Sequence, residues 1–192
     1  MKTMTKVMTA LGLVLCLGLL TAVSGRAAVS DGLTITLTPT GERGVIIDTD
    51  TIAMSGLLLG TTNYTGGVSG VVVIATGTIA PIEYTIQGSL AGGWSLSTDG
   101  YADAQNELAV HALFNATAPG RAAFEGADIS KNLLGAAAQV GDLAGKYAGD
   151  QVMDDMPLNA SRNLWFQLKM PPTSSLLGEQ TISVVVTAEA PN

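Results

Sequence analysis

The sequence contains one cysteine and one histidine among its 192 residues. A single cysteine, Cys16, excludes an internal disulfide. Any Ser-His-Asp arrangement or imidazole metal site would have to be built around His111. The Gly-x-Ser-x-Gly elbow of the α/β-hydrolases is also missing. These absences argue against thiol chemistry and histidine-based hydrolysis, so we predict no catalytic residue and no enzyme.

Charge is also scarce, at 13% of residues against the usual quarter. Nine Lys and Arg face sixteen Asp and Glu, for a formal net charge of −7, and the basic residues are scattered singly. Nucleic acid and anionic lipid are bound by clustered Lys and Arg. The composition therefore disfavours nucleic-acid binding.

The N terminus has the features of a secretory signal peptide. Lys2 and Lys6 precede an uncharged apolar stretch from Val7 to Val23, and small residues surround Ala27. We expect a signal-peptide helix over residues 1–27, with cleavage after Ala27, and a single domain over residues 28–192. The alternative is a retained transmembrane anchor, but the apolar stretch is barely long enough for a bilayer core of roughly 30 Å.

Cleavage would change the composition of the protein. It removes three of the nine bases and none of the sixteen acids, so the mature net charge is 6 − 16 = −10. It also removes Cys16, which is preceded by Leu15 rather than by the small residue that a lipidation site requires. We therefore expect an acidic, thiol-free protein that is secreted, periplasmic or on the cell surface, with no membrane span after cleavage.

Apolar and polar residues alternate with a period of two in most of the mature chain, as in strands with one buried face. Several apolar runs are separated by Gly, Pro and Asp, which predicts an all-β, immunoglobulin-like antiparallel β-sandwich. The expected strands cover residues 33–38, 45–47, 71–74, 82–87, 94–96, 107–114, 164–169 and 182–186.

Three details of this prediction can be checked separately. The apolar run from Val71 to Ile74 predicts a strand buried on both faces, with residues 82–87 as its antiparallel partner. The Gly- and Thr-rich residues 60–67 predict a turn or loop. Between Pro119 and Pro157 we expect one long, partly irregular loop, with residues 129–140 as the only segment able to form a helix.

Three segments, Gly93–Leu96, Arg162–Leu168 and Gln180–Ala188, resemble secreted bacterial Ig-like surface domains. Trp94-Ser95-Leu96 is similar to the first motif of the WxL cell-wall domains, whose second Trp-x-Leu is replaced by valines in the last strand here. The mature layout also resembles uncharacterised single-domain exported bacterial proteins. The resemblance implies a fold and a surface location, and it implies no activity.

Few side chains are candidates for ligand contact. Trp165 and Trp94 are the expected sugar-stacking residues, with Tyr101 and Tyr147 as the other aromatic options. Trp165 is favoured because strand parity points it away from Leu164 and Phe166, although it could also pack against the second sheet or under the long loop. For Trp94, a role as a core anchor is favoured over ligand contact.

The remaining polar candidates have simpler explanations. Strand parity points the His111 side chain to the face opposite that of Val110 and Ala112, in or near water. The acidic pairs Asp48 with Asp50 and Asp154 with Asp155 lack the continuation of an EF-hand, so turn formation is favoured over calcium binding. We therefore predict no metal site and no cofactor.

These observations favour a non-enzymatic structural or adhesive protein of a bacterial envelope, with self-association as one option. A carbohydrate- or peptidoglycan-binding module is the alternative, so the expected partners are the protein itself or cell-envelope glycans. Residues Leu33 to Thr38 could be donated to a neighbour's open sheet edge, but pairing within the same domain is favoured. A hydrolase is the third option.

Overall fold

The computed structural model describes residues 41–49, 51–65, 70–125, 130–140, 146–176 and 178–191. Residues from Thr40 to Asn192 form one compact unit. The predicted signal peptide and the predicted strand at residues 33–38 lie outside the described residues. Within the described ranges, no helix is long and apolar enough to span a membrane.

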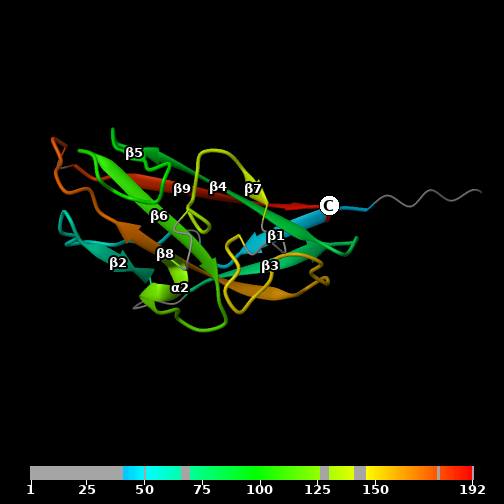
Figure 1. The fold of residues 1–192 in the computed structure, drawn as a ribbon. Coiled ribbons are helices and arrows are strands. Elements are labelled where there is room, and N and C mark those ends of the chain that lie inside the picture. The colour runs from blue at the N-terminus through cyan, green and yellow to red at the C-terminus, as the bar shows by residue number, and fades with distance from the viewer. Residues whose placement is uncertain are drawn as a thin grey trace, which may run out of the picture. The chain divides into compact units, whose positions relative to one another are not determined.

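The described chain is almost entirely β, which confirms the predicted fold class (Figure 1). The only helix in these ranges is the short α2, Arg121–Glu125. The strands are β1 Arg43–Ile47, β2 Thr62–Tyr64, β3 Val71–Gly77, β4 Glu83–Ala91, β5 Ser95–Leu96, β6 Glu107–Phe114, β7 Gln139–Val140, β8 Ser161–Lys169 and β9 Thr181–Glu189.

The strands form two sheets. The larger has the order β1-β3-β8-β6-β5, with β2 also paired to β8, and the smaller has the order β7-β4-β9. The pairs are antiparallel except for β5 with β6, which is parallel and departs from the all-antiparallel prediction. The immunoglobulin-like arrangement stays a prediction.

One hydrophobic core joins the two sheets. Alternate side chains of β3, β6 and β8 in the larger sheet pack with those of β4 and β9 in the smaller sheet. This is the two-layer solution expected of sheets that each have an apolar face. The contributing strand residues that are buried include Val71, Val73, Ala75, Tyr84, Ile86, Leu108, Val110, Ala112, Phe114, Leu164, Phe166, Leu168 and Val186.

Strand β3 is buried on one face only, so the prediction of two buried faces is wrong. Val71, Val73 and Ala75 are at most 5% exposed, while Val72 and Ile74 are only partly buried. The reason is that the core covers one face of the larger sheet, and no second cluster of the described residues covers the outer face at β3.

The predicted pairing of β4 with β3 is also wrong. β4 pairs along its whole length with β9, so the chain changes sheets between Gly77 and Glu83 (Figure 1). Gly77 permits the change of direction because its φ is 110°, and a Cβ there would lie 2.1 Å from the Glu42 carbonyl oxygen. Alternation in sequence cannot distinguish a hairpin from such a crossing.

Two local predictions are wrong because contacts with distant parts of the chain determine the backbone conformation there. Residues 62–64, expected in a loop, form β2 because β8 supplies a ladder for them. In the described part of the expected helix 129–140, Leu134 N donates to Val110 O at 2.7 Å and Gly88 N donates to Gly135 O at 2.8 Å. These bonds hold the segment against both sheets in a non-helical conformation, so tertiary contacts override its helix propensity.

Candidate functional site

Trp165 lies beneath α2 rather than on the surface. Its side chain points away from the main core, as parity predicted, but it packs with Leu113, Phe124 and Tyr64 in a second apolar cluster and is only 7% exposed. Its indole Nε1–H donates to Asn115 O at 2.7 Å. Little ring surface is left for a sugar, so the structure favours the expected alternative of packing under the long loop.

Trp94 is half-buried at the margin of the main core. Its Nε1–H donates to Ser174 Oγ at 3.0 Å, and its backbone N–H donates to Gln180 Oε1 at 3.3 Å. Trp94 therefore joins the start of β5 to the connection that leads into β9. These contacts are those of a structural anchor.

His111 is fully buried, so the prediction that it lies in or near water is wrong. Its cross-strand neighbour on β8 is Gln167, which is also fully buried. The segment containing Asn132 and Leu133 pairs with the edge of β6 beside His111, with Ala112 N donating to Asn132 O at 2.9 Å. Helix α2 packs on the face of β6 that His111 shares with Leu113. Both belong to the long connection, which strand parity alone could not place.

The described aspartates of the two acidic pairs hold backbone amides. Asp48 Oδ1 accepts from Val72 N at 2.7 Å, and Asp154 Oδ1 accepts from Asp155 N at 2.8 Å. Asp155 itself has a φ of 52°, as turn aspartates tolerate. Asp50 lies outside the described residues, and among those that are described no group of three or more His, Cys, Asp or Glu could hold a metal ion.

The best candidate for ligand contact is an open groove beside Tyr101, which is 49% exposed. The groove has a volume of about 240 Å³ and lies between the start of β2, the β5–β6 connection and the end of β8. Its lining residues are Gly60, Thr61, Thr62, Tyr101, Ala102, Asp103, Lys169, Met170 and Pro172. We call it the Tyr101 groove.

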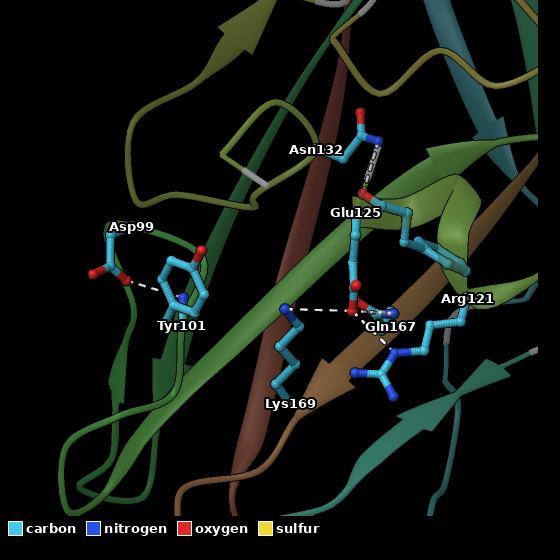
Figure 2. A network of polar contacts seen from close by, with 8 residues as sticks. Asp99, Tyr101, Arg121, Glu125, Asn132, Gln167 and Lys169 are labelled. Atoms are coloured by element: carbon cyan, nitrogen blue, oxygen red, sulfur yellow. Dashed lines mark hydrogen bonds and ion pairs between the residues drawn. The ribbon is translucent and has the colours of Figure 1, made fainter. Parts of the chain in front are cut away.

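Hydrogen bonds fix the turn that presents Tyr101. Asp99 accepts from Tyr101 N at 2.9 Å (Figure 2). It also accepts from Ser97 Oγ at 2.9 Å, and Gly100 N donates to Ser97 Oγ at 3.2 Å. The bond from the Tyr101 amide, followed by that from Ser97, lowers the pKa of Asp99. Gly100 has a φ of 89°, a conformation that side chains disfavour. The aromatic ring is therefore carried on a defined turn.

Lys169 forms the opposite wall of the groove, where its ammonium group contacts both a carboxylate and an aromatic ring. Its Nζ lies 3.4 Å from Glu125 Oε1 and 5.6 Å from the Tyr101 ring centroid (Figure 2). The same Glu125 oxygen accepts from Arg121 Nε at 3.2 Å and from Gln167 Nε2 at 3.5 Å. Burial alone would raise the pKa of Glu125, but Arg121 and Lys169 outweigh it and hold that pKa below its usual value.

The floor of the groove is also held by backbone bonds. Met170 N donates to Thr61 O at 2.8 Å, and Gly60 N donates to Pro171 O at 2.9 Å. Asp103 N donates to Glu107 Oε2 at 3.2 Å. The Asp103 carboxylate and the Thr62 hydroxyl have no hydrogen-bond partner in the described part of the chain, so both can serve a ligand.

Sequence reasoning found Tyr101 only as one of four aromatic options and missed the groove itself. Asp103 and Lys169 carry no motif, and they meet only because the end of β8 lies beside the β5–β6 connection. No protein-family model matches the chain, and no curated protein matches it.

Proposed function

We propose that the chain is an exported, non-enzymatic structural or adhesive protein of a bacterial envelope that self-associates through β9. Export is supported by the leader, which holds the only cysteine and three of the nine bases. N-terminal sequencing of protein exported from a bacterial host should give Ala28 as the first residue. Retention of the leader would contradict export by cleavage.

The observation that carries self-association is the edge strand β9. It has nine residues and pairs with β4 alone among the described strands, while β1 of the larger sheet lies close to it without a ladder (Figure 1). It contains no Pro, Lys or Arg, which are the usual protection of an edge. Its outward face consists of Thr181, Ser183, Val185, Thr187 and Glu189, all exposed.

The side chains of β9 are compatible with pairing to a second copy. An antiparallel pair centred on Val185, which is 48% exposed, places Ser183 opposite Thr187 and Thr181 opposite Glu189. The two Glu189 carboxylates are then at opposite ends of the ladder, and Val185 meets its own copy. The net charge of −10 opposes association, so moderate salt should strengthen it.

Light scattering after size-exclusion chromatography, with negative-stain microscopy, tests the proposal on residues 28–192. We expect dimers or larger species that grow with protein concentration. Val185→Lys should shift them to monomer at unchanged thermal stability, because the position is exposed. Leu58→Lys, at a residue that is 70% exposed and outside β9, is the matched control and should still associate. A strict monomer that does not bind cell-wall fractions would contradict the proposal.

A carbohydrate- or peptidoglycan-binding module is the second candidate. The specific observation in its favour is the half-exposed Tyr101 in a groove beside the Asp103 carboxylate and the Thr62 hydroxyl, for which no hydrogen-bond partner lies among the described residues. Trp94 and Trp165 support it less, because both indole N–H groups already donate within the domain.

A further inference from the structure

We infer that the Tyr101 groove binds a neutral pyranose saccharide, with the ring of Tyr101 as the stacking surface. The inference rests on the adhesive function proposed above and names a ligand class for it. Carbohydrate recognition combines an apolar ring face with polar groups that bind hydroxyls, and the groove offers both.

Tyr101 is suited to stacking by its exposure and by its rigidity. Tyr101 is 49% exposed, and its backbone is fixed by the hydrogen bond from its N–H to Asp99. A tyrosine presented in this way gives a large contact area and loses little conformational entropy on binding. The C–H face of a pyranose ring is the kind of surface that such a ring contacts.

Asp103 and Thr62 supply the polar partners. A carboxylate accepts hydrogen bonds from two sugar hydroxyls, and a threonine hydroxyl can donate or accept one. Both side chains line the groove, and no partner for either lies among the described residues. Their backbones are held, Asp103 by Glu107 and Thr62 by the β2–β8 ladder, so the two groups keep their spacing.

The charges of the groove select against acidic ligands. Lys169 is its only cation among the lining residues, and the Glu125 carboxylate at 3.4 Å, which also pairs with Arg121, offsets part of that charge. Asp103 forms no ion pair with the described residues, so its carboxylate would repel a phosphate or a uronic acid. The favoured ligand therefore carries hydroxyls and no net charge.

The size of the groove sets the expected affinity. About 240 Å³ in an open groove is below the range of drug-sized pockets, so contact is limited to about one sugar ring and a Kd on the order of 1 mM is expected. Self-association through β9 would place several grooves on one particle, and avidity would then raise the effective affinity for a repeating glycan.

NMR titration of residues 28–192 with neutral oligosaccharides, maltotriose and chitotriose, tests the inference. We expect saturable amide shifts at Thr62, Tyr101, Ala102 and Lys169 with at least one of the two sugars. Tyr101→Ala should weaken binding at least tenfold, Tyr101→Phe should retain it, and Asp103→Asn should weaken it several-fold. Leu58→Ala, which removes an exposed apolar side chain elsewhere, should leave it unchanged.

Three results would overturn the inference: no shifts with either sugar up to tens of millimolar, shifts that persist in Tyr101→Ala, or equal binding of a trigalacturonate. Light scattering on the same samples separates this failure from that of the proposed assembly. If the protein associates but binds no sugar, only the saccharide site is contradicted. If the protein is monomeric and binds sugar in a way that depends on Tyr101, only self-association is contradicted.

Discussion

Tyr84 and Tyr147 are both fully buried, but only one of their hydroxyls is hydrogen-bonded within the described chain. Tyr147 Oη donates to Leu133 O at 3.0 Å, whereas Tyr84 Oη has no partner there. Tyr147→Phe should therefore lower the free energy of unfolding by about 1–3 kcal/mol, since a buried carbonyl loses its donor. Tyr84→Phe should leave it unchanged or raise it. Urea unfolding of both variants measures the difference, and the reverse order would contradict the assignment.

The same burial predicts an alkaline transition. Burial raises the pKa of Tyr84 and of Tyr147 to about 12, with the charge of Arg162 partly opposing the shift at Tyr84. The pKa of each tyrosine in the folded protein exceeds its ordinary value of about 10, so folding favours the neutral hydroxyl. The stability that this preference contributes is complete below pH 10 and is lost as the pH rises through about 12. Phenolate absorbance should show both groups ionising late. A variant with Phe at both positions should lack that late phase, and an unchanged titration curve would contradict the prediction.

The segment 130–140 is held to the smaller sheet at a glycine of β4. Leu134 is fully buried against Gly88, where a Cβ would lie 2.5 Å from Leu134 Cδ2. Gly88→Ala should therefore destabilise the fold by about 1–3 kcal/mol, because a well-packed contact must move. Gly135→Ala is the control, since no atom lies within 4 Å of its Cβ, and it should stay within about 0.5 kcal/mol. Equal unfolding midpoints for the two variants would show that the segment is not packed in this way.

The periodic strands were predictable from sequence, and the segments fixed by distant partners were not. β6, β8 and β9 each lie where alternation places them, because a period of two depends only on the strand's own residues. The burial of His111 depends instead on α2 and on the segment at Asn132 and Leu133, both of which belong to the long connection. The Tyr101 groove could not be predicted for the same reason, because its walls come from three separate parts of the chain.

At the scale of the whole molecule, two properties bear on the proposed assembly: the acidic composition, and the edge of β9 that pairs with no other described strand. The net charge, −7 for the full chain and −10 after the predicted cleavage, opposes association, and pairing at β9 would favour it. The balance between these two effects makes assembly dependent on concentration and on salt.

Backbone amide exchange in β9 is the most direct test of self-association through this strand. Exchange of residues 28–192 is measured by NMR at two protein concentrations and compared with Val185→Lys. We predict that the β9 amides that are not bonded to β4 exchange more slowly as the wild-type concentration rises, while those bonded to β4 stay equally protected. We also predict no such slowing in Val185→Lys. Edge amides that exchange at the same rate at both concentrations would contradict self-association through β9.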